Sequence, residues 1–409
     1  MTVKLEQFIV SHPTGNTFVR ALLSELNQQN RLQKYFTSLG TGRGSYFTSK
    51  LFGQRRNYGL NANQLSTQFF PEILRLLPLG RKSQQSRRNA VDRSYQSLDN
   101  RVSRSLASQE AKIIHAYEDG ARASFNRAKE LGILCSYELP IAHWATVRRL
   151  LAEEAERLPE WEPTLESTRE PEEKLARKEE EITLADCITC PSQFVLQSIP
   201  KEIRRNKPCQ VAPFGSPIPV QNLEPKRREG NEPLKLLFVG SMSQRKGLAD
   251  LFEAMKILRR EPLKLTVLGQ PSMPMEFYRK HYSDFNHLSP CSNARVRQVM
   301  QNHDALVLPS IAEGRALVQQ EALSCGLPIV VTPNAGGEDL VEEGVTGYLT
   351  PPRSPVSLAE KITELIKKRK SLFDLRRSCR EKANRYQWSA YARQIIDFCL
   401  RISNNPSDS

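Results

Sequence analysis

The chain has 409 residues, which is enough for two domains of ordinary size. Its 25% charged and 39% hydrophobic residues are typical of a globular protein and argue against wholesale disorder. No apolar run approaches the roughly 20 residues of a membrane-spanning helix, and the first residues lack the basic start and apolar core of a signal peptide. Eight scattered cysteines, several of them in apolar segments, favour buried thiols in a cytoplasmic protein over a disulfide framework.

The formal net charge is +14, and residues 1–150 carry most of it, with 22 Lys and Arg against 10 Asp and Glu. Such a basic region can bind an anionic membrane surface or a phosphorylated acceptor, or it can simply be a solvated surface. Aromatic residues are not interleaved with the basic clusters as a stacking surface for single strands would require, so nucleic acid is the weaker partner.

The N-terminal half begins as an α/β pattern and then becomes less regular. The apolar run 8–10 predicts a strand, and apolar residues at helical spacing follow it. Residues 51–104 have a poor pattern that predicts loops and mobile helices. Order returns with strands at 111–114 and 133–137 around a helix over about 120–131.

Two segments in the middle of the chain stand out by composition. Residues 152–183 are highly charged and broken by three prolines, which predicts an exposed helical insertion rather than core. Short apolar segments follow at 182–189 and 210–212. Residues 221–233 have no apolar periodicity and are dominated by Pro, Gly and charge, so we expect a linker there.

Beyond the linker the alternation of strands and helices is clear. The predicted strands are 236–239, 265–268, 305–308 and 329–332, and the predicted helices are 248–258, 316–325 and 358–366. This alternation predicts a parallel sheet covered on both faces, which binds ligands at the carboxyl ends of its strands.

The segment with the clearest chemistry is 309–331, PSIAEGRALVQQEALSCGLPIVV. A strand leads to Glu313 and Gly314, and a helix begins almost at once, so its free N–H groups can hold a pyrophosphate. Glu321, further along this helix, is suited to accept hydrogen bonds from ribose hydroxyls, and Glu313 to contact a sugar. An ordinary amphipathic helix with two solvated glutamates would show the same spacing.

This segment resembles the E-x7-E donor-site motif of the group 1 glycosyltransferases, which are retaining enzymes of the GT-B fold. Other segments resemble family motifs in the same order: FVGSMSQRKG (238–247), DALVLPS (304–310), NAGGEDLVEEGVTGYL (334–349), ADCITCPSQFV (185–195) and VAPFG (211–215). The match covers about 185–390 clearly and 1–184 faintly.

The resemblance implies a transferase, expected to move a hexose from a nucleotide sugar to an acceptor hydroxyl with retention of configuration. Glu321 would hold the ribose, Glu313 the donor sugar, and Lys246 with Arg245 the diphosphate. The cations would substitute for a divalent metal, so we expect no metal and no cofactor. The implied donor-binding set is Arg245, Lys246, Gly240, Gly314, Arg315, Ala316, Leu317, Glu321 and Gly15.

The chain departs from the family pattern at three places. Ser241 stands where arginine is common, and Arg315-Ala316 replaces Phe-Gly, which adds a cation near the sugar or phosphate. The family's cleft histidine is missing, and Glu138 takes its place in the faint alignment, with His115 as the other candidate for acceptor activation. A structural histidine is the simpler explanation for His115.

Two further motifs are weak. The glycine run at 40–44 lacks dinucleotide-site spacing, and Cys187 with Cys190 lacks a second ligand pair for zinc. We therefore expect two Rossmann-like domains facing across a cleft: 1–220 on the acceptor side, 221–385 for the donor, and a helix in 386–409 that crosses back. A catalytically silent nucleotide-sugar-binding relative, or a basic scaffold peripheral to a membrane, is the alternative.

Overall fold

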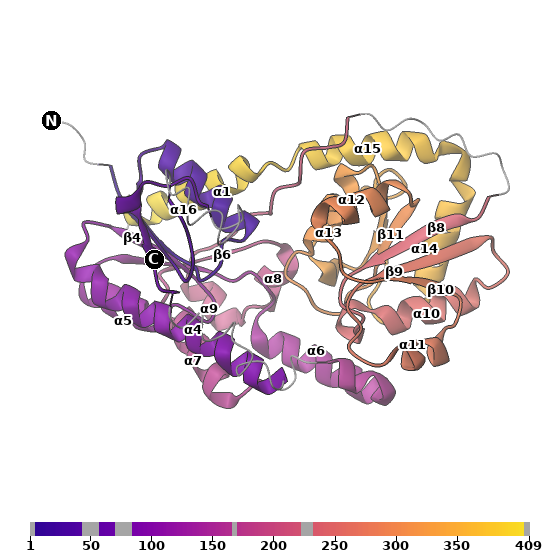
Figure 1. The fold of residues 1–409 in the computed structure, drawn as a ribbon, viewed down its shortest axis with the longest axis horizontal. Coiled ribbons are helices and arrows are strands. Elements are labelled where there is room, and N and C mark those ends of the chain that lie inside the picture. Colours follow the sequence, from indigo (N-terminus) through magenta and orange to yellow (C-terminus); the bar gives the residue numbers. More distant parts are fainter. Residues whose placement is uncertain (1–4, 43–56, 70–83, 166–169, 222–231, 405–409) are drawn as a thin grey trace.

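The computed structural model describes residues 5–42, 57–69, 84–165, 170–221 and 232–404. These residues form two α/β domains, each built on one parallel sheet, that lie side by side in Figure 1. The predicted fold class of two Rossmann-like domains is confirmed. The segment 51–104, whose sequence pattern is irregular, and the predicted linker 221–233 both fall partly outside the described residues.

The N-terminal domain has a seven-stranded sheet. Its strands are β1 (Phe8–Ser11), β2 (Leu32–Thr37), β3 (Leu65–Thr67), β4 (Ile113–Tyr117), β5 (Leu134–Glu138), β6 (Cys187–Cys190) and β7 (Cys209–Val211). They pair in the order β3-β2-β1-β4-β5-β6-β7, and every pair is parallel. Parallel strands need crossovers, and in this domain the crossovers are mostly helical.

The helices of this domain lie on both faces of the sheet. They are α1 (Thr17–Gln28), α4 (Gln84–Ser105), α5 (Arg122–Glu130), α6 (Trp144–Arg157), α7 (Glu172–Leu184), α8 (Gln193–Ser198) and α9 (Lys201–Asn206), with short 3₁₀ turns η2 (Ala62–Gln64), η4 (Leu106–Ser108) and η5 (Pro159–Thr164). The 22-residue α4 lies at the end of the stretch predicted as loops and mobile helices, where a low proportion of apolar residues hides the helical period.

The C-terminal domain has a six-stranded parallel sheet. Its strands are β8 (Leu234–Val239), β9 (Leu263–Leu268), β10 (Phe285–Leu288), β11 (Ala305–Leu308), β12 (Ile329–Val331) and β13 (Gly347–Leu349), in the order β10-β9-β8-β11-β12-β13. The helices are α10 (Leu248–Ile257), α11 (Met275–His281), α12 (Asn293–Gln301), α13 (Leu317–Ser324), α14 (Pro355–Lys367) and α15 (Leu372–Asn384), with short turns η7 (Gln244–Lys246), η8 (Pro333–Ala335), η9 (Glu338–Leu340) and η10 (Arg369–Ser371).

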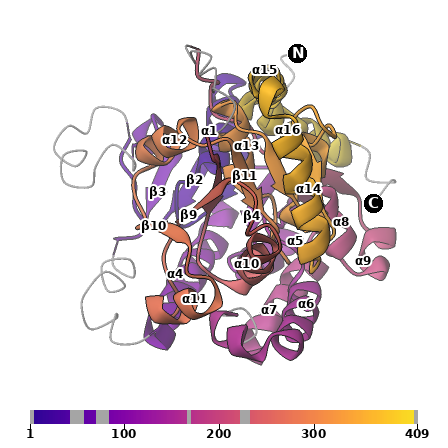
Figure 2. The same ribbon diagram turned by 90° about the vertical axis from the view of Figure 1, so that its right-hand side faces the viewer.

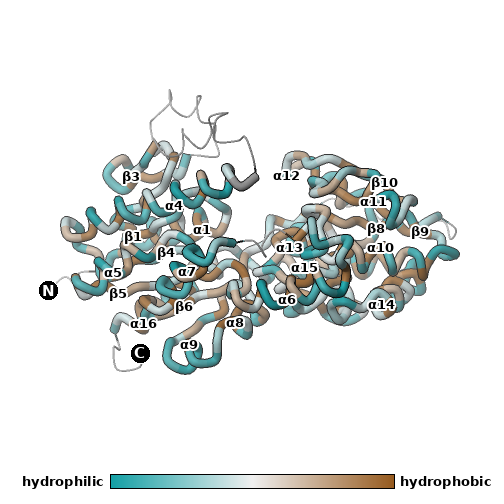
Figure 3. The backbone as a smooth tube through the Cα atoms, turned by 90° about the horizontal axis from the view of Figure 1, so that it is seen from below, coloured by the Kyte–Doolittle hydropathy of each residue, from teal (hydrophilic) through white to brown (hydrophobic). Residues whose placement is uncertain are grey.

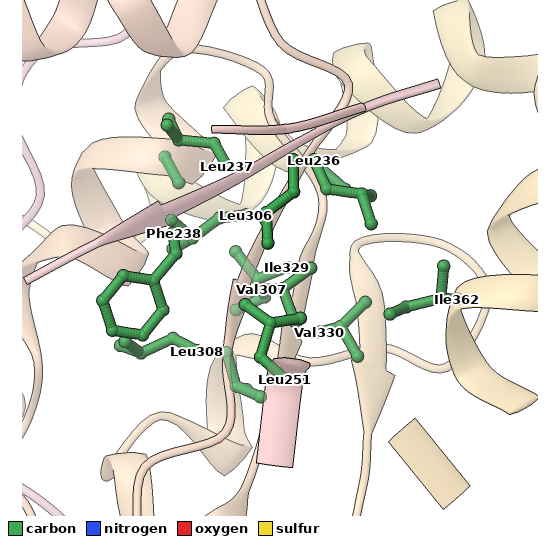
Figure 4. Packing of buried hydrophobic residues seen from close by; sticks show 14 of the residues in the cluster. Leu236, Leu237, Phe238, Leu251, Leu306, Val307, Leu308, Ile329, Val330 and Ile362 are labelled. Atoms are coloured by element: carbon green, nitrogen blue, oxygen red, sulfur yellow. The ribbon is translucent and has the colours of Figure 1, made fainter. Parts of the chain in front are cut away.

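The core of the C-terminal domain explains why its strands are visible in the sequence. Strands buried on both faces are apolar at every position, and the side chains of β11 and β12 are fully buried. Figure 4 shows Phe238, Leu306 and Val330 packed with Leu251 of α10 and Ile362 of α14. In Figure 3 the strand segments β8 and β9 are largely hydrophobic, whereas outer helices such as α9 are hydrophilic.

The last helix, α16 (Trp388–Asn404), returns to the N-terminal domain. It packs on α1, and its Tyr391, Ile395 and Cys399 belong to the same hydrophobic cluster as Phe18 and Leu22. Figure 1 shows α15 and α16 following one another along the top of the molecule from one domain to the other, and in Figure 2, seen from the side of the C-terminal domain, α15 again lies at the top. The chain therefore joins the two domains a second time.

The charged stretch 152–183 is not the exposed insertion that its composition predicts. Trp161 is 2% exposed and lies in the core cluster of the C-terminal domain, and Glu154 and Glu181 are fully buried. These charges can be buried because each has a partner: Arg157 donates to Glu154, and the backbone N–H groups of Asp119 and Ala121 donate to Glu181. We call α6 and η5 together the arm, because they reach from the first domain to the second.

Two expectations on composition can be compared with the structure. All eight cysteines are free, and six of them are buried, as the sequence indicated. None of the helices in the described ranges is both long and apolar enough to span a bilayer.

Candidate functional site

The topology places a switch point in each sheet. β1 lies between β2 and β4, and β8 lies between β9 and β11, so the loops after β1 and β4, and after β8 and β11, leave their sheets in opposite directions. Crevices at such points are where open α/β sheets bind ligands. The predicted residues Gly240, Lys246 and Glu313 all follow β8 or β11.

Glu313 lies at the centre of an ion cluster after β11. Its Oε1 is 2.6 Å from Nη1 of Arg245 and 2.6 Å from Nζ of Lys246, and Arg245 also donates to the carbonyl of Ala312. Burial lowers the pKa of Lys246, although the charge of Glu313 opposes the shift. One carboxylate between two cations leaves a net positive charge. The three residues that the sequence assigned to one site therefore lie next to one another, and their role in donor binding stays a prediction.

The loop that carries Glu313 touches the N-terminal domain. The N–H of Ala142 donates to the carbonyl of Glu313 over 3.3 Å, and Ser192 Oγ donates to the carbonyl of Gly314 over 2.6 Å. A Cβ on Gly314 would lie 1.8 Å from the carbonyl oxygen of Pro140, so only glycine permits this approach. The carboxyl ends of the two sheets thus meet at Gly314.

The beginning of α13 offers free backbone donors. Among the described residues, the N–H groups of Gly314, Arg315 and Leu317 have no hydrogen-bond partner, whereas that of Ala316 donates to the carbonyl of Ala335 over 3.1 Å. The first N–H groups of a helix have no acceptor within it, and the helix dipole makes this end partly positive. Together with Arg245 and Lys246, this end of α13 is suited to an anionic group.

Glu321 lies about one turn into α13 and is half-buried. Its carboxylate has no hydrogen-bond partner within the described part of the chain. Burial raises its pKa, and the charge of Arg297 opposes that shift. A half-buried carboxylate without a partner can accept hydrogen bonds from a ligand's hydroxyl groups.

Arg315 has a different environment from the one its sequence position suggests. Its guanidinium is 1% exposed and forms a bidentate pair with Asp339 over 2.7 and 3.0 Å, and it also donates to the carbonyl of Gly336 and to Gln320. This arginine therefore ties the α13 loop to the segment after β12 and does not present a free cation.

The loop after β8 is held by the arm. Gly240 has φ +154°, and its backbone lies against the side chain of Lys246. The next turn, η7, begins with Gln244, whose N–H donates to Thr164 Oγ1 over 3.0 Å and whose Nε2 donates to Glu154 and Asp250. The cation-bearing turn is thus positioned by residues of the N-terminal half.

No sequence pattern indicates these arm contacts. Thr164 and Glu154 lie in the stretch whose charge predicted exposure to solvent. Arg157 bridges Glu154 to Asp250, with donor–acceptor distances of 2.8 to 3.2 Å. Arg353 reaches the same Glu154 at 2.5 Å. Only the packing of the two domains brings these residues together.

Glu138 and His115, the two alternatives for acceptor activation, are in contact with each other. His115 Nε2 is 3.2 Å from Glu138 Oε2, and Tyr391 of α16 donates to Glu138 Oε1 over 2.7 Å. Burial disfavours the charged imidazole, but hydrogen bonds to Cys399 and Glu138 raise the pKa of His115 to about 9. Both side chains are at most 1% exposed, so they face each other and α16 rather than solvent, and a role in activation stays a prediction.

The loop after β1 contains a histidine that the sequence reasoning missed. The ring of His12 is buried edge-on against Phe18 and Tyr117, and burial lowers its pKa to about 4. Gly15 lies close to the ring of Tyr58 in the same domain, so its place beside a donor also stays a prediction. The signal for His12 was its position directly after a strand.

No group of three or more His, Cys, Asp and Glu side chains suited to a metal ion occurs within the described ranges. Cys187 lies on β6 near Cys399, and hydrogen bonding to Cys399, together with burial, raises the pKa of the Cys187 thiol well above its usual value. This thiol thus stays protonated.

The C-terminal domain resembles a known protein family. Residues 220–386 match the family described as glycosyl transferases group 1. Two curated relatives are D-inositol 3-phosphate glycosyltransferases, from Paenarthrobacter aurescens (28% identity, 38% of this chain and 41% of the relative) and from Pseudarthrobacter chlorophenolicus (30% identity, 44% and 47%). The matched part thus spans less than half the length of these relatives.

Solved structures resemble the chain over nearly its full length. Sucrose-phosphate synthase from Thermosynechococcus elongatus superposes with a TM-score of 0.68 at 16% identity, covering 97% of this chain and 99% of the other. HepE from Anabaena, in complex with UDP and glucose, has a TM-score of 0.59 at 15% identity, covering 97% and 100%. At such identities the likeness establishes the fold. The family match is thus confined to the C-terminal domain and its flanks, and the two domains together have the GT-B fold.

Proposed function

We propose that this protein transfers a hexosyl group from a nucleotide-sugar donor to an acceptor hydroxyl, with retention of the anomeric configuration. One observation carries the proposal: the carboxylate of Glu313 holds Arg245 and Lys246 at 2.6 Å each, beside the free N–H groups that begin α13. A sugar-contacting carboxylate and two diphosphate-binding cations are thereby within a few ångströms of one another.

The donor would bind with its diphosphate on Lys246, Arg245 and the N–H groups of Arg315 and Leu317. When an anionic diphosphate arrives, the two cations can exchange part of their contact with Glu313 for contact with phosphate oxygens. Glu313 is then free to accept hydrogen bonds from the donor sugar, and Glu321 from the ribose. The HepE structure, which contains UDP and glucose, supports this class of donor.

In the proposed reaction, the bond from the anomeric carbon to the diphosphate oxygen breaks and a bond to the acceptor oxygen forms on the same face. The acceptor's proton passes to the departing diphosphate, whose negative charge grows as the bond breaks. Preorganised donors directed at this developing charge lower the barrier. Because Lys246 and Arg245 neutralise it, we propose that no divalent metal is required.

The first experiment is a donor panel. Wild-type protein is incubated with UDP-glucose, UDP-galactose, UDP-N-acetylglucosamine and GDP-mannose in excess EDTA, and released nucleoside diphosphate is measured. One donor should be turned over slowly by water. Binding of a donor without any turnover would support a catalytically silent relative, and turnover only with added manganese would contradict the metal-free proposal.

The second experiment tests the ribose contact. Glu321→Gln should raise the dissociation constant of the preferred donor about tenfold, or ~1.4 kcal/mol, because a charged acceptor is lost. Glu276→Gln on the exposed surface of α11 is the matched control and should bind as the wild type does. Unchanged affinity in a folded Glu321 variant would remove this residue from the donor site.

A further inference from the structure

A second feature at the carboxyl ends of the N-terminal sheet is a small cavity beside the loop after β4. It has a volume of about 210 Å³ and lies between this loop, the beginning of α6 and the helix α7. The N-terminal sheet reverses its strand order between β1 and β4, so the cavity lies next to a switch point.

One wall of the cavity is apolar and contains an aromatic ring. Ile141, Ala142, Val147 and Leu175 line it, together with Trp144, whose indole N–H donates to Glu179 over 2.6 Å. That hydrogen bond fixes the plane of the ring. An apolar wall with an oriented aromatic face fits the C–H face of a ring-shaped ligand.

The other wall consists of charged groups. Glu118, Asp119 and Glu170 supply carboxylates, and Lys178 is 3.0 Å from Glu170 and 3.6 Å from Glu118. Lys174 lies 3.2 Å from Asp119 and 2.6 Å from Glu170. Arg148 also lines the cavity, and its guanidinium is 2.8 Å from Glu172. The three cations Lys174, Lys178 and Arg148 are balanced by the three carboxylates before Glu172 is counted, so this wall does not favour a phosphate group, whereas hydroxyl groups can both donate to and accept from it.

Glu118 is the group that points to a ligand. Its side chain is 9% exposed, and its one ion pair within the described ranges, with Lys178, is at 3.6 Å longer than a hydrogen bond, so no protein group there donates to the carboxylate. Burial raises its pKa. A carboxylate this enclosed can accept hydrogen bonds from a ligand's hydroxyl groups in place of the water that reaches it.

The loop that carries Glu118 is held in an uncommon conformation. Asp119 has φ +75°, and its N–H and that of Ala121 both donate to the buried carboxylate of Glu181. Backbone held in the left-handed region by surrounding contacts is typical of functional loops.

The cavity is also next to the loop of Glu313. Ile141 and Ala142 line it, and the same two residues touch Gly314 and Glu313 from the N-terminal side. A ligand in the cavity therefore lies next to the loop that carries Glu313. The volume of the cavity is below the roughly 300 Å³ of pockets for drug-sized ligands, so the cavity suits a ligand with a single ring.

We infer that this cavity binds the acceptor, and that the acceptor part it takes is an uncharged, ring-shaped polyol such as a monosaccharide or a cyclitol, with Glu118 accepting from its hydroxyl groups and Trp144 stacking on its face. The inference rests on the proposed function, because it assigns the acceptor side of that reaction. It names Glu118 as a binding residue for the acceptor and not for the donor.

The test measures acceptor binding directly. Saturation-transfer NMR and calorimetry are recorded for wild-type protein with UDP present, using methyl α-glucoside and myo-inositol as uncharged probes and glucose 6-phosphate as the charged one. We expect at least one uncharged probe to bind, and Glu118→Gln to weaken it about tenfold, as expected for a lost charged hydrogen bond. Glu130→Gln, a surface carboxylate with 63% exposure in the same domain, should bind like the wild type.

The affinity for UDP distinguishes a failure of the proposed function from a failure of the acceptor inference. Wild-type protein that binds no UDP and turns over no donor overturns the proposed function. Normal UDP binding, with equal probe affinity in Glu118→Gln or with binding of glucose 6-phosphate alone, overturns only the acceptor inference. Should Glu118→Gln fail to fold, Trp144→Leu gives the same test, since loss of the ring should also weaken the uncharged probe while UDP binds normally.

Discussion

The two sheets of this protein are built alike but gather their charged side chains differently. In the C-terminal domain, Arg245, Lys246 and Glu313 lie on loops that follow β8 and β11, and they keep free donors and a net positive charge beside α13. In the N-terminal domain, Glu138 and Glu181 are buried and fully engaged, and Glu138 binds Tyr391 from the far end of the chain.

This difference indicates that the charged side chains of the two domains have different roles. The C-terminal loops are arranged to receive an anion, since their charges can be re-paired by a ligand. The engaged charges of the N-terminal domain hold segments in place: Glu181 fixes the loop after β4, and Glu138 fixes α16. The arm has a further role, because its Thr164 and Glu154 hold the turn that begins with Gln244 in the other domain. Four predictions test this comparison.

The largest expected effect concerns the arm. Arg157 is the partner of both Glu154 and Asp250, whose side chains are 0% and 2% exposed. Arg157→Met leaves two buried carboxylates with less compensation, and we expect the free energy of unfolding to fall by about 4 kcal/mol. Urea titration measures it, with Arg149→Met, 62% exposed, as a control of little effect. Equal stability of both variants would show that the arm is not integral to the fold.

The next prediction concerns His12. Its pKa is about 4 in the folded protein because the ring is buried, and about 6.5 when unfolded. As pH falls from 6.5 towards 4, the unfolded chain binds a proton that the folded chain does not, so stability is lost, by up to about 3 kcal/mol below pH 4. His12→Asn should remove this part of the acid sensitivity. Parallel stability curves of the two proteins between pH 4 and 7 would contradict the assignment.

A third prediction addresses the C-terminal cations. Lys246→Met removes a charge from the diphosphate position, and kcat/KM for the preferred donor should fall about 100-fold. Lys256→Met on α10, with 45% of its side chain exposed, is the matched control. Wild-type turnover in the Lys246 variant would mean that the ion cluster with Glu313 is structural.

The smallest expected effect concerns the contact between the arm and the turn that begins with Gln244. Thr164→Val keeps the shape of a side chain that is 2% exposed but removes the acceptor for the N–H of Gln244. We expect a loss of about 1 kcal/mol, seen as an increase of about fivefold in the KM for the donor. Thr363→Val, within α14, makes the same change away from the site and should leave the KM unaltered.

The sequence by itself determined most of the C-terminal domain. Strands such as 305–308 are uniformly apolar because helices cover both faces of the sheet, and glycines and acidic residues mark the loops at their ends. The resemblance to the group 1 glycosyltransferases implied one site for Glu313 and Lys246, and parallel strands, whose carboxyl ends meet at one edge, allow it. The short strands β2 and β3 were not predicted, since few of their residues have a distinctive period.

Only the tertiary structure decided what the charged residues of the N-terminal half do. A local pattern records charge but not the partner that neutralises it, so Glu154 and Glu181 were expected in solvent although both are fully buried. For the same reason Arg315 could not be known to pair with Asp339, nor Glu138 with His115. A buried charge is stable only beside its partner, and most of these partners come from other elements of the fold.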